Sequence, residues 1–261
     1  MKFIKEKKFS NGSVYLLETE DGYPVEVTDT YLPYYTKNAI GRNQNSLESS
    51  EIGSRKERWM IGVSVMSGCP VGCKFCATGK LKKCRNLTAD EIVDQVIFII
   101  EKYGHDAPQK SLEFKINYTR MGEPFLNIDA VKKAINAITL YYSNTHHYVS
   151  TVGVKGSDFS FIKGNITLQF SVHSFSEDYR NWLIPFKNKM TLSEMGKIRT
   201  ESKLKTTLNL TLVNESDFDI KKLEKWFNKD YFFVKLSPIN PNETSNSNGV
   251  NVGVIKQLNI L

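Results

Sequence analysis

Three cysteines lie within a stretch of eight residues, and their spacing constrains this chain more than any other feature. Cys69, Cys73 and Cys76 follow the pattern C-x3-C-x2-C, with the aromatic Phe75 directly before the last of them. Three thiolates on one tight loop supply three of the four ligands that a [4Fe–4S] cluster takes. The fourth iron then keeps an open position, which can bind a small molecule and pass an electron to it.

A structural zinc site is the alternative interpretation of these cysteines. Such a site takes four ligands in a tetrahedron, and Cys84 is the one further cysteine in the sequence. Zinc sites usually combine two C-x2-C pairs, whereas this chain has a single pair. The spacing therefore favours an iron–sulfur cluster, and zinc remains the alternative.

The position of the cysteines also bears on the cellular compartment. All four lie between residues 69 and 84, which excludes a disulfide framework spread through the fold and is typical of a reducing compartment. The N-terminus has no apolar run typical of a signal peptide, and no stretch of the chain approaches the length of a membrane span. We therefore expect a cytoplasmic protein without a membrane partner.

The net charge of the chain is +7, with a pI of about 9.0. A basic balance favours acidic partners, including nucleic acid. Lysines and arginines are scattered along the sequence, apart from small clusters such as residues 80–85. A solvated, lysine-rich surface is therefore the alternative explanation of the charge.

Short β-like runs alternate with helical runs along most of the chain. We expect strands at residues 60–66, 112–118, 148–152, 166–172, 206–213 and 232–236. We expect helices at residues 88–103, with Thr88 as the N-cap, and at 129–142, 192–202 and 219–228, with shorter helical pieces at 158–163 and 254–258.

This alternation predicts an α/β fold with a parallel sheet. Six strands with right-handed crossovers would curl into a partial (β/α)6 barrel, similar to a TIM barrel. Ligands of such sheets bind at the carboxyl ends of the strands, and the cysteine loop follows the first predicted strand. We therefore expect the cysteines at this end of the sheet.

Two domains are expected. Residues 1–58 should form an N-terminal β extension, with a hairpin of residues 13–18 and 23–31 followed by a polar loop at 34–58. Residues 59–261 should form the core barrel. Residues 242–251 are rich in Asn and Ser and are expected to be a flexible loop.

Several short motifs follow the cysteines in order, each where a strand is expected to end. They are Ala77-Thr78-Gly79, Arg85-Asn86-Leu87-Thr88, Met121-Gly122-Glu123-Pro124, Val149-Ser150-Thr151, Phe170-Ser171-Val172-His173, Ile184-Pro185 and Ser237-Pro238-Ile239-Asn240-Pro241. Together with the cysteines they resemble the radical S-adenosylmethionine (SAM) enzymes that methylate adenine in ribosomal and transfer RNA, the RlmN/Cfr type. The resemblance spans roughly residues 15–245.

The resemblance implies a [4Fe–4S] cluster on the three cysteines, SAM on the open iron and an electron donor such as flavodoxin or ferredoxin. The residues that it assigns to SAM are Gly122, Glu123, Ser150, Ser171, His173 and Asn240. Hydroxyl, imidazole, amide and carboxylate groups are chemically suited to this task. The alternatives are an ordinary turn residue for Glu123 and a structural buried histidine for His173.

The chain also departs from this family. The family carries a cysteine within the strand that leads into the cluster, and Gly62 stands in its place here. The family's methyl-carrying cysteine lies in a C-terminal segment that this sequence lacks, and the accessory N-terminal RNA-binding domain is also expected to be absent. We therefore expect that methyl transfer by two cysteines does not run here.

Two further residues are candidates for the reaction itself. Cys84 is a candidate radical quencher or hydrogen donor, and its alternative is a small residue in a basic loop. Glu26 falls where the family carries an acidic residue near the substrate and is a candidate acid or base. A strand glutamate at the surface is the alternative for Glu26.

The sequence thus predicts a radical SAM enzyme that cleaves SAM to a 5′-deoxyadenosyl radical, which abstracts hydrogen from a substrate. The resemblance and the basic charge favour an RNA base or nucleotide as that substrate. A small molecule or peptide is the alternative, with a mutase, dehydrogenase or non-RNA methylase reaction. A zinc-stabilised binding module is the non-enzymatic alternative.

Overall fold

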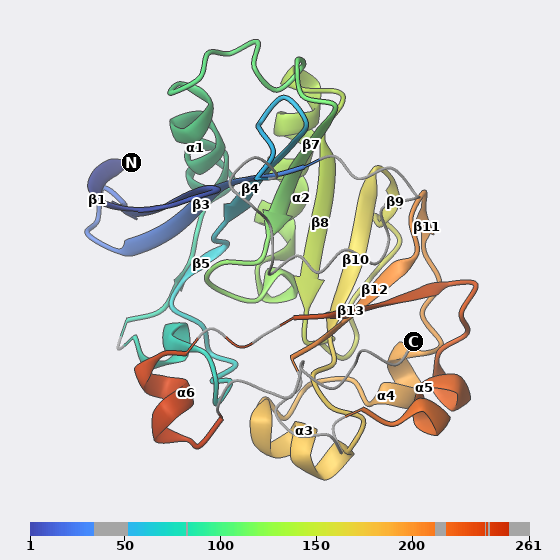
Figure 1. The fold of residues 1–261 in the computed structure, drawn as a ribbon. Coiled ribbons are helices and arrows are strands. Elements are labelled where there is room, and N and C mark those ends of the chain that lie inside the picture. Colours follow the sequence, from blue (N-terminus) through green and yellow to red (C-terminus); the bar gives the residue numbers. More distant parts are fainter. Residues whose placement is uncertain (34–51, 82, 212–217, 238, 240, 251–261) are drawn as a thin grey trace. The chain divides into compact units, whose positions relative to one another are not determined.

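The computed structural model describes residues 1–33, 52–81, 83–211, 218–237, 239 and 241–250 (Figure 1). The chain divides into two compact units. The first unit comprises Met1–Ser67, Asn86–Met121 and Asn127–Tyr148, and the second comprises Gly68–Arg85, Gly122–Leu126 and Val149–Leu261. Among the described residues, no helix combines the length and the apolar character that a membrane span needs.

The first unit is built on a sheet whose strands follow one another in the order β1, β2, β3, β4, β7 and the start of β8. Their bounds are β1 Lys2–Phe9, β2 Gly12–Glu18, β3 Pro24–Leu32, β4 Arg58–Val63, β7 Glu113–Tyr118 and β8 His146–Thr151. The pairings from β1 to β4 are antiparallel, and β4 pairs with β7 in parallel. The β2–β3 pairing confirms the predicted hairpin. Sequence periodicity does not predict β1, because this lysine-rich strand is exposed along almost its whole length.

One face of this sheet is apolar and packs against helices. Helix α1 (Ala89–Ile100) contacts β4 and α2 (Ile128–Tyr141). Trp59 of β4 and Phe114 of β7 are buried, and their rings contact Tyr103 and Tyr142, which follow the two helices. This face therefore forms the core of the first unit.

Helix α1 begins where the sequence predicts. The side chain of Thr88 accepts a hydrogen bond from the backbone N–H of Glu91, and the Glu91 carboxylate accepts one from the N–H of Thr88. This reciprocal cap satisfies two backbone donors that the first turn of a helix would otherwise leave unpaired.

The opposite face of the sheet is polar. Buried and partly exposed residues alternate along β7, and Glu113, Lys115 and Asn117 form its partly exposed set. Glu26 and Thr28 of β3 and Gly62 of β4 lie on the same face, because the ladder pairs Thr28 with Gly62 and Gly62 with Asn117. The face that the helices leave uncovered is thus polar, while the covered face also holds the buried carboxylate of Asp29, which accepts a hydrogen bond from the indole N–H of Trp59.

The second unit contains the end of β8 followed by three parallel strands. These are β10 (Ile166–Ser171), β12 (Thr206–Leu210) and β13 (Phe232–Leu236). The helices are α3 (Glu177–Leu183), α4 (Leu192–Met195), α5 (Ile220–Trp226) and α6 (Glu243–Ser247). Its shorter elements are β9 (Lys163–Gly164), β11 (Glu201–Ser202) and the 3-10 turns η4 (Ala77–Lys80) and η5 (Pro124–Leu126). β5 (Met66–Ser67) belongs to the first unit, and β6 (Arg85–Asn86) lies at the boundary between a segment of each unit. The predicted alternation of strands and helices is confirmed.

Three local predictions are wrong. Residues 158–163 form turns and the start of β9 rather than a helix. The helix expected at 192–202 ends at Met195, where Gly196 approaches Trp226 so closely that a Cβ would lie 2.0 Å from the Trp226 carbonyl oxygen. Residues 243–247 form helix α6 rather than a flexible loop, because Asn242 caps them through two backbone N–H groups. Most of the loop expected at 34–58 and the helical piece expected at 254–258 lie outside the described residues.

Candidate functional site

The cysteine loop, residues 68–76, belongs to the second unit and turns at two glycines. Gly68 has φ 79° and Gly72 has φ 69°, in the left-handed region that favours glycine. A Cβ on Gly68 would lie 2.8 Å from the carbonyl oxygen of Lys83. The loop closes with a 3.1 Å hydrogen bond from the N–H of Cys76 to the carbonyl of Cys73. These contacts fix the backbone of the loop and thereby the relative positions of the three cysteine side chains.

An apolar cluster of the second unit supports the cysteine loop. It consists of Val71, Val152, Leu183, Ile184, Ile239 and Val250. Cys69, Cys73 and Phe75 pack against it and are partly buried, and the N–H of Lys74 donates to the carbonyl of Leu183 at 2.9 Å. The loop is therefore held by packing as well as by its own turns.

Burial strongly affects the thiols. It raises the pKa of Cys69 to about 12 and the pKa of Cys73 well above its usual value. The negative charges of Cys76 and Glu123 raise both values further. A bound metal supplies the positive charge that stabilises thiolates, so these thiols would ionise as the metal binds.

The donor set is suited to a cluster rather than to one ion. Within the described residues, no group of three or more His, Cys, Asp or Glu side chains surrounds a position for a single metal ion. A cubic cluster binds each cysteine through a separate iron and so accepts sulfurs that do not converge on one point. Three half-buried sulfurs on one supported loop therefore fit a [4Fe–4S] cluster better than tetrahedral zinc.

Helix α6 holds the cysteine loop through its backbone. The side-chain amide of Asn242 donates to the carbonyl of Phe75, and that of Asn248 donates to the carbonyl of Lys74, each at 3.0 Å. Asn248 also donates to the carbonyl of Thr244 within the helix region. Neither asparagine could be predicted as a contact of the cysteine loop, because nothing in an Asn-rich stretch indicates a partner about 170 positions away.

Glu123 braces the turn after Gly122. Its Oε1 accepts from the N–H of Phe125 at 3.2 Å, and its Oε2 accepts from the N–H of Val152 at 2.9 Å. Burial raises its pKa to about 7, although hydrogen bonds from Thr151, Val152 and Phe125 act in the opposite direction. A buried carboxylate held in this way stabilises a cation that approaches it.

His173 adopts an uncommon backbone conformation, with φ 60°, the one positive φ among the described non-glycine residues. Its Nδ1 accepts from the N–H of Thr211 at 3.2 Å and lies 2.8 Å from Thr211 Oγ1. Burial lowers its pKa to about 3, so the ring is neutral and carries its proton on Nε2. The ring meets Phe75 edge-on, with centroids 4.9 Å apart, and thus contacts the cysteine loop.

Polar side chains line one face of the strands in this unit. Ser150 Oγ donates to Gln169 Oε1 at 2.9 Å, and the Asn209 amide lies 3.5 Å from the same oxygen. Ser171 pairs with Asn209 in the β10–β12 ladder. Ser150 and Ser171 are predicted site residues from the sequence motifs, whereas Gln169 and Asn209 are not. The alternation within β10 and β12 is a signal that would have placed them on the same face.

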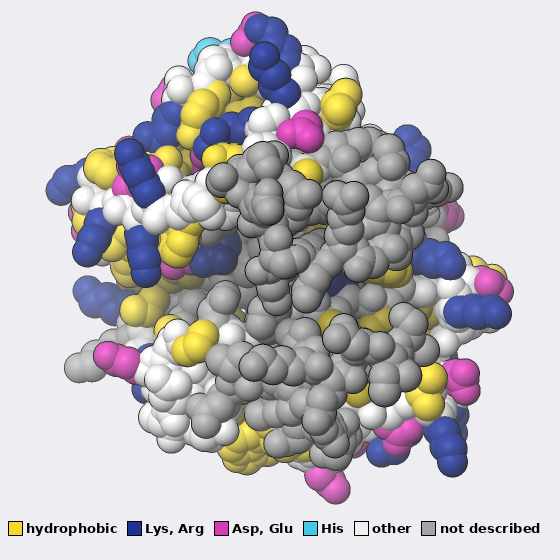
Figure 2. Space-filling model, viewed as in Figure 1, with side chains coloured by type: hydrophobic (Ala, Val, Ile, Leu, Met, Phe, Trp, Pro, Cys, Tyr) yellow, Lys and Arg dark blue, Asp and Glu magenta, His cyan; other side chains and the backbone are white. Residues whose placement is uncertain are grey.

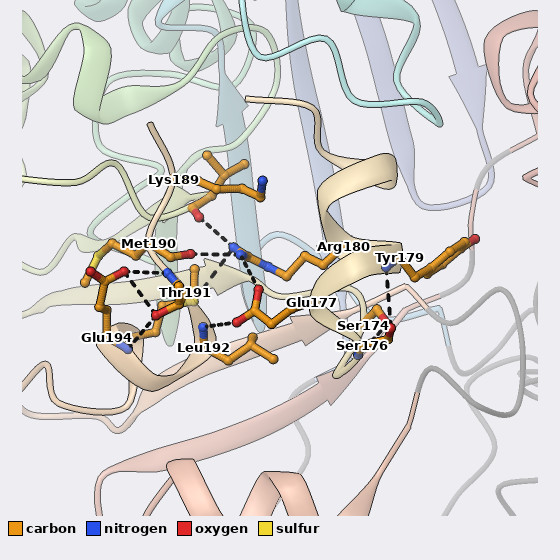
Figure 3. A network of polar contacts seen from close by, with 12 residues as sticks. Ser174, Ser176, Glu177, Tyr179, Arg180, Lys189, Met190, Thr191, Leu192 and Glu194 are labelled. Atoms are coloured by element: carbon orange, nitrogen blue, oxygen red, sulfur yellow. Dashed lines mark hydrogen bonds and ion pairs between the residues drawn. The ribbon is translucent and has the colours of Figure 1, made fainter. Parts of the chain in front are cut away.

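A buried arginine fixes the segment beside the polar strand ends. Arg180 is fully buried, and its guanidinium donates to the carbonyls of Met190 and Val152 at 2.8 and 2.9 Å. Figure 3 shows it reaching from α3 toward Met190, with Glu177 beside it. Burial lowers its pKa to about 10, which still leaves it protonated at neutral pH. Because Val152 also donates to Glu123, Arg180 helps to fix the backbone that holds this carboxylate.

The remaining predicted residues lie in different places. Cys84 is exposed in the second unit, and a Cβ on Gly68 would lie 3.0 Å from the Cβ of Cys84. Glu26 belongs to the first unit, where it pairs with Arg120. Asn240 lies outside the described residues. The structure thus groups Glu123, Ser150, Ser171 and His173 with the three cysteines in one unit.

The sequence pattern of the Radical SAM superfamily matches residues 63–227. The matched stretch includes the cysteine loop, Glu123 and His173. The chain belongs to the radical SAM superfamily. Membership makes it an enzyme of the radical SAM class, whose cofactors are a [4Fe–4S] cluster and SAM. This finding disfavours the zinc-binding module.

Curated relatives agree with this assignment. The chain is 30% identical over 253 residues to "Dual-specificity RNA methyltransferase RlmN" of Helicobacter hepaticus, covering 92% of this chain and 65% of that protein. It is 31% identical over 260 residues to the protein of the same name of Campylobacter concisus, covering 94% of this chain and 65% of that protein. The chain thus spans less than two thirds of the length of these relatives. The predicted resemblance to the RlmN type is confirmed.

A solved structure confirms the fold class. The crystal structure of a radical SAM methyltransferase from Sphaerobacter thermophilus matches 92% of this chain and 67% of that chain. The TM-score is 0.67 at 25% sequence identity. The predicted α/β fold of the radical SAM type, the partial (β/α)6 barrel class, is therefore correct.

Proposed function

We propose that this radical SAM enzyme binds its cluster through Cys69, Cys73 and Cys76 and cleaves SAM reductively. The 5′-deoxyadenosyl radical that results abstracts a hydrogen atom from an RNA base or nucleotide. The observation that carries this proposal is the contact between the cysteine loop and the polar strand ends of the second unit. Phe75 of the loop meets His173, and Glu123 is bonded to Val152 beside the same loop-supporting cluster.

Side chains of this unit supply complementary groups for SAM. Glu123 provides a buried carboxylate for the ammonium group, and the Nε2–H of neutral His173 provides a donor. Ser150 and Ser171, together with Gln169 and Asn209, offer hydroxyl and amide groups for the ribose and the adenine edge. Gly122 and Asn240 complete the proposed set.

The cofactor supplies the difficult chemistry. With a cluster held by Cys69, Cys73 and Cys76, SAM would accept one electron from a flavodoxin or ferredoxin, and cleavage of a carbon–sulfur bond would give methionine and the 5′-deoxyadenosyl radical. The protein orients SAM and shields it. The apolar cluster under the cysteine loop excludes water from one side of the site. Clustered free thiols are consistent with a reducing compartment, and we place the protein in the cytoplasm.

The names of the relatives and the positive charge support an RNA substrate. Figure 2 shows Lys and Arg side chains scattered over the coloured part of the visible face and mixed with hydrophobic and acidic ones. On the coloured part of this face, such a distribution supports separate, weak contacts with a phosphate backbone. Glu26 remains the proposed acid or base, and Cys84 the proposed hydrogen donor.

One observation favours a reaction other than methyl transfer, which the alternative substrates, a small molecule or peptide, would also undergo. Gly62 stands where the RNA-methylating enzymes carry a cysteine, and the stem of Arg120 occupies the space beside it. The first unit therefore offers an arginine where a thiol is expected. A reaction other than methyl transfer, such as a radical rearrangement or dehydrogenation, needs no thiol at this position.

Anaerobic turnover tests the proposal. Reconstituted protein is incubated with SAM and dithionite, and the products are separated by mass spectrometry. 5′-Deoxyadenosine without S-adenosylhomocysteine would support radical formation without methyl transfer. Both products together would show that a methylation route operates. The absence of both products would refute the radical reaction.

A pair of cysteine variants tests the metal site. Cys69→Ala should lose bound iron, because it removes one of three ligands from a supported loop. Cys84→Ala is the matched control and should retain iron, because Cys84 is exposed and outside the C-x3-C-x2-C pattern. Equal iron contents in the two variants would contradict the assigned ligands.

A further inference from the structure

An arginine and a glutamate form an ion pair at the carboxyl edge of the parallel strands in the first unit. Arg120 follows the end of β7 by two residues, and its guanidinium pairs with the carboxylate of Glu26 in β3. Their side chains are 34% and 36% exposed, so the pair faces solvent while part of each side chain is buried. Neither side chain is needed to complete the apolar core.

Gly62 provides the space that Arg120 uses. A Cβ on Gly62 would lie 3.1 Å from Cδ and 3.3 Å from Cγ of Arg120, and 2.4 Å from Oγ1 of Thr28. The aliphatic stem of Arg120 therefore lies directly over the glycine. Any larger residue at position 62 would displace either the arginine or the threonine. The glycine and the arginine thus form one structural feature.

Ser64 fixes the backbone on both sides of the pair. Its hydroxyl donates to the carbonyl of Glu26 at 2.6 Å and accepts from the N–H of Met121 at 3.2 Å. The N–H of Arg120 donates to the carbonyl of Val63 at 3.1 Å. Ser64 is fully buried, so these bonds are shielded from water. The two charged side chains are therefore presented from a preorganised backbone, as a binding site requires.

The pair has unused hydrogen-bonding capacity. The guanidinium of Arg120 carries several N–H donors in a side chain that is 34% exposed, and among the described residues its ion-pair partner is Glu26. A carboxylate accepts about four hydrogen bonds, so the single bond from Arg120 leaves capacity on Glu26. The site thus offers a donor beside an acceptor with no net charge.

This combination selects a class of ligand. A phosphate or a carboxylate would be attracted by Arg120 and repelled by Glu26, and a cation would experience the reverse. A neutral planar group with an acceptor next to a donor satisfies both side chains at once. The edge of a nucleobase is such a group, and arginine and glutamate both read base edges through hydrogen bonds.

We propose that Arg120 and Glu26 together bind the edge of the substrate base and that Arg120 determines which base is accepted. This inference rests on the proposed RNA or nucleotide substrate. It gives Arg120 a specificity role for which the sequence motifs provide no signal, and it explains why a glycine stands at position 62. The arginine stem needs the space that a side chain would take.

Base discrimination by short RNA tests the proposal. The anaerobically reconstituted protein, with SAM present, is titrated with the fluorescent hexamers rA6, rC6 and rU6 at several salt concentrations. Wild type should bind the best and the worst hexamer with affinities that differ at least about five-fold, as expected for a two-point base contact. Arg120→Lys, which keeps the charge but loses the planar fork, should abolish this difference and leave the salt dependence unchanged.

Arg58→Lys is the matched control. Arg58 lies on the same sheet face in an ion pair with Glu113, and its side chain is 20% exposed. This variant should keep the discrimination between hexamers. Thermal unfolding of each variant shows whether it has folded.

Three results would overturn the inference. They are equal binding of all hexamers by wild type, no binding at all, or a uniform loss of affinity in Arg120→Lys with a smaller salt slope, which would indicate a phosphate contact. The formation of 5′-deoxyadenosine in the same preparations tests the proposed function separately. If it persists while base discrimination is absent, the radical reaction stands and the role of Arg120 does not.

Discussion

The imidazole of His173 lies edge-on against the ring of Phe75, with centroids 4.9 Å apart and planes at 73°. His173 follows strand β10, and Phe75 directly precedes the third cysteine of the loop. The histidine adopts φ 60°, and its Nδ1 accepts a hydrogen bond from the N–H of Thr211, which fixes the position of the ring. The contact therefore links a strand end rigidly to the cysteine loop.

His173→Ala should destabilise the protein more than His173→Gly. Both variants leave the backbone N–H of Thr211 without its acceptor, at a cost of about 1–3 kcal/mol. Only glycine adopts the positive φ without strain, and alanine there costs about 1–2 kcal/mol more. Urea unfolding measures the difference. Equal midpoints for the two variants would show that the backbone at this position is not strained.

His147 should make the protein sensitive to acid. Burial lowers its pKa to about 3 from an ordinary value of 6.5, and its ring nitrogens lie 3.1 Å from the hydroxyl of Tyr118 and 2.9 Å from that of Thr139. Because the unfolded chain binds the proton more readily, neutral His147 contributes fully to the free energy of unfolding above pH 6.5. This contribution is lost as the pH falls toward 3.

His147→Gln should remove part of this acid sensitivity. For each pH unit below about 6.5, protonation of this residue lowers the free energy of unfolding of the wild type by up to about 1.4 kcal/mol. Denaturant unfolding between pH 4 and 8, a range of about four units, compares the slopes of the two proteins. His105→Gln, at an exposed position, is the control and should retain the wild-type slope. A His147→Gln variant with an unchanged slope would contradict the prediction.

Arg180→Lys should destabilise the second unit severely. An ammonium group cannot reach both carbonyls that the buried guanidinium holds, so one carbonyl and part of the charge lose their partners. We expect a loss of about 3–5 kcal/mol. Arg199→Lys is a matched control, because Arg199 also donates to two carbonyls but is exposed, and it should cost less than about 1 kcal/mol. Thermal unfolding measures both losses of stability. If Arg180→Lys and Arg199→Lys lose similar amounts, burial does not make Arg180 more important than Arg199.

Gly62→Ala should lower the free energy of unfolding by about 1–3 kcal/mol, because the added methyl group overpacks the site. The new Cβ would lie 2.4 Å from Oγ1 of Thr28, and the added Thr28→Ala change removes this contact. The double variant should therefore be more stable than the sum of the two single changes predicts. Denaturant midpoints of the four proteins complete the cycle, and strict additivity would show that the two side chains do not compete for space.

The features that local sequence determines could be predicted. The spacing of Cys69, Cys73 and Cys76 predicts one short cysteine loop, and the place of Thr88 before a helical period predicts the cap of α1. Most strands of the sheet are predictable because each is a short β-rich run between turn residues, whereas the exposed, lysine-rich β1 is not. In all these cases the signal lies within a few residues of the feature.

Other features depend on parts of the chain that are distant in sequence. Arg180 binds carbonyls 10 and 28 positions away, and Asn248 binds a carbonyl 174 positions away. The type of these residues does not predict their partners, because an arginine or asparagine is usually found at the surface. The pairing of Arg120 with Glu26 is of the same kind, since it depends on how β3, β4 and β7 align.

Helix α6 has a consequence for how freely the cysteine loop can vary. Asn242 and Asn248 bind the carbonyls of Phe75 and Lys74, which every amino acid possesses, and ignore the side chains of these residues. Mutations at position 74 therefore leave this hold intact. Position 74 is therefore free to vary in sequence, and a protein engineer can alter the charge of the loop there without changing the residues that anchor it.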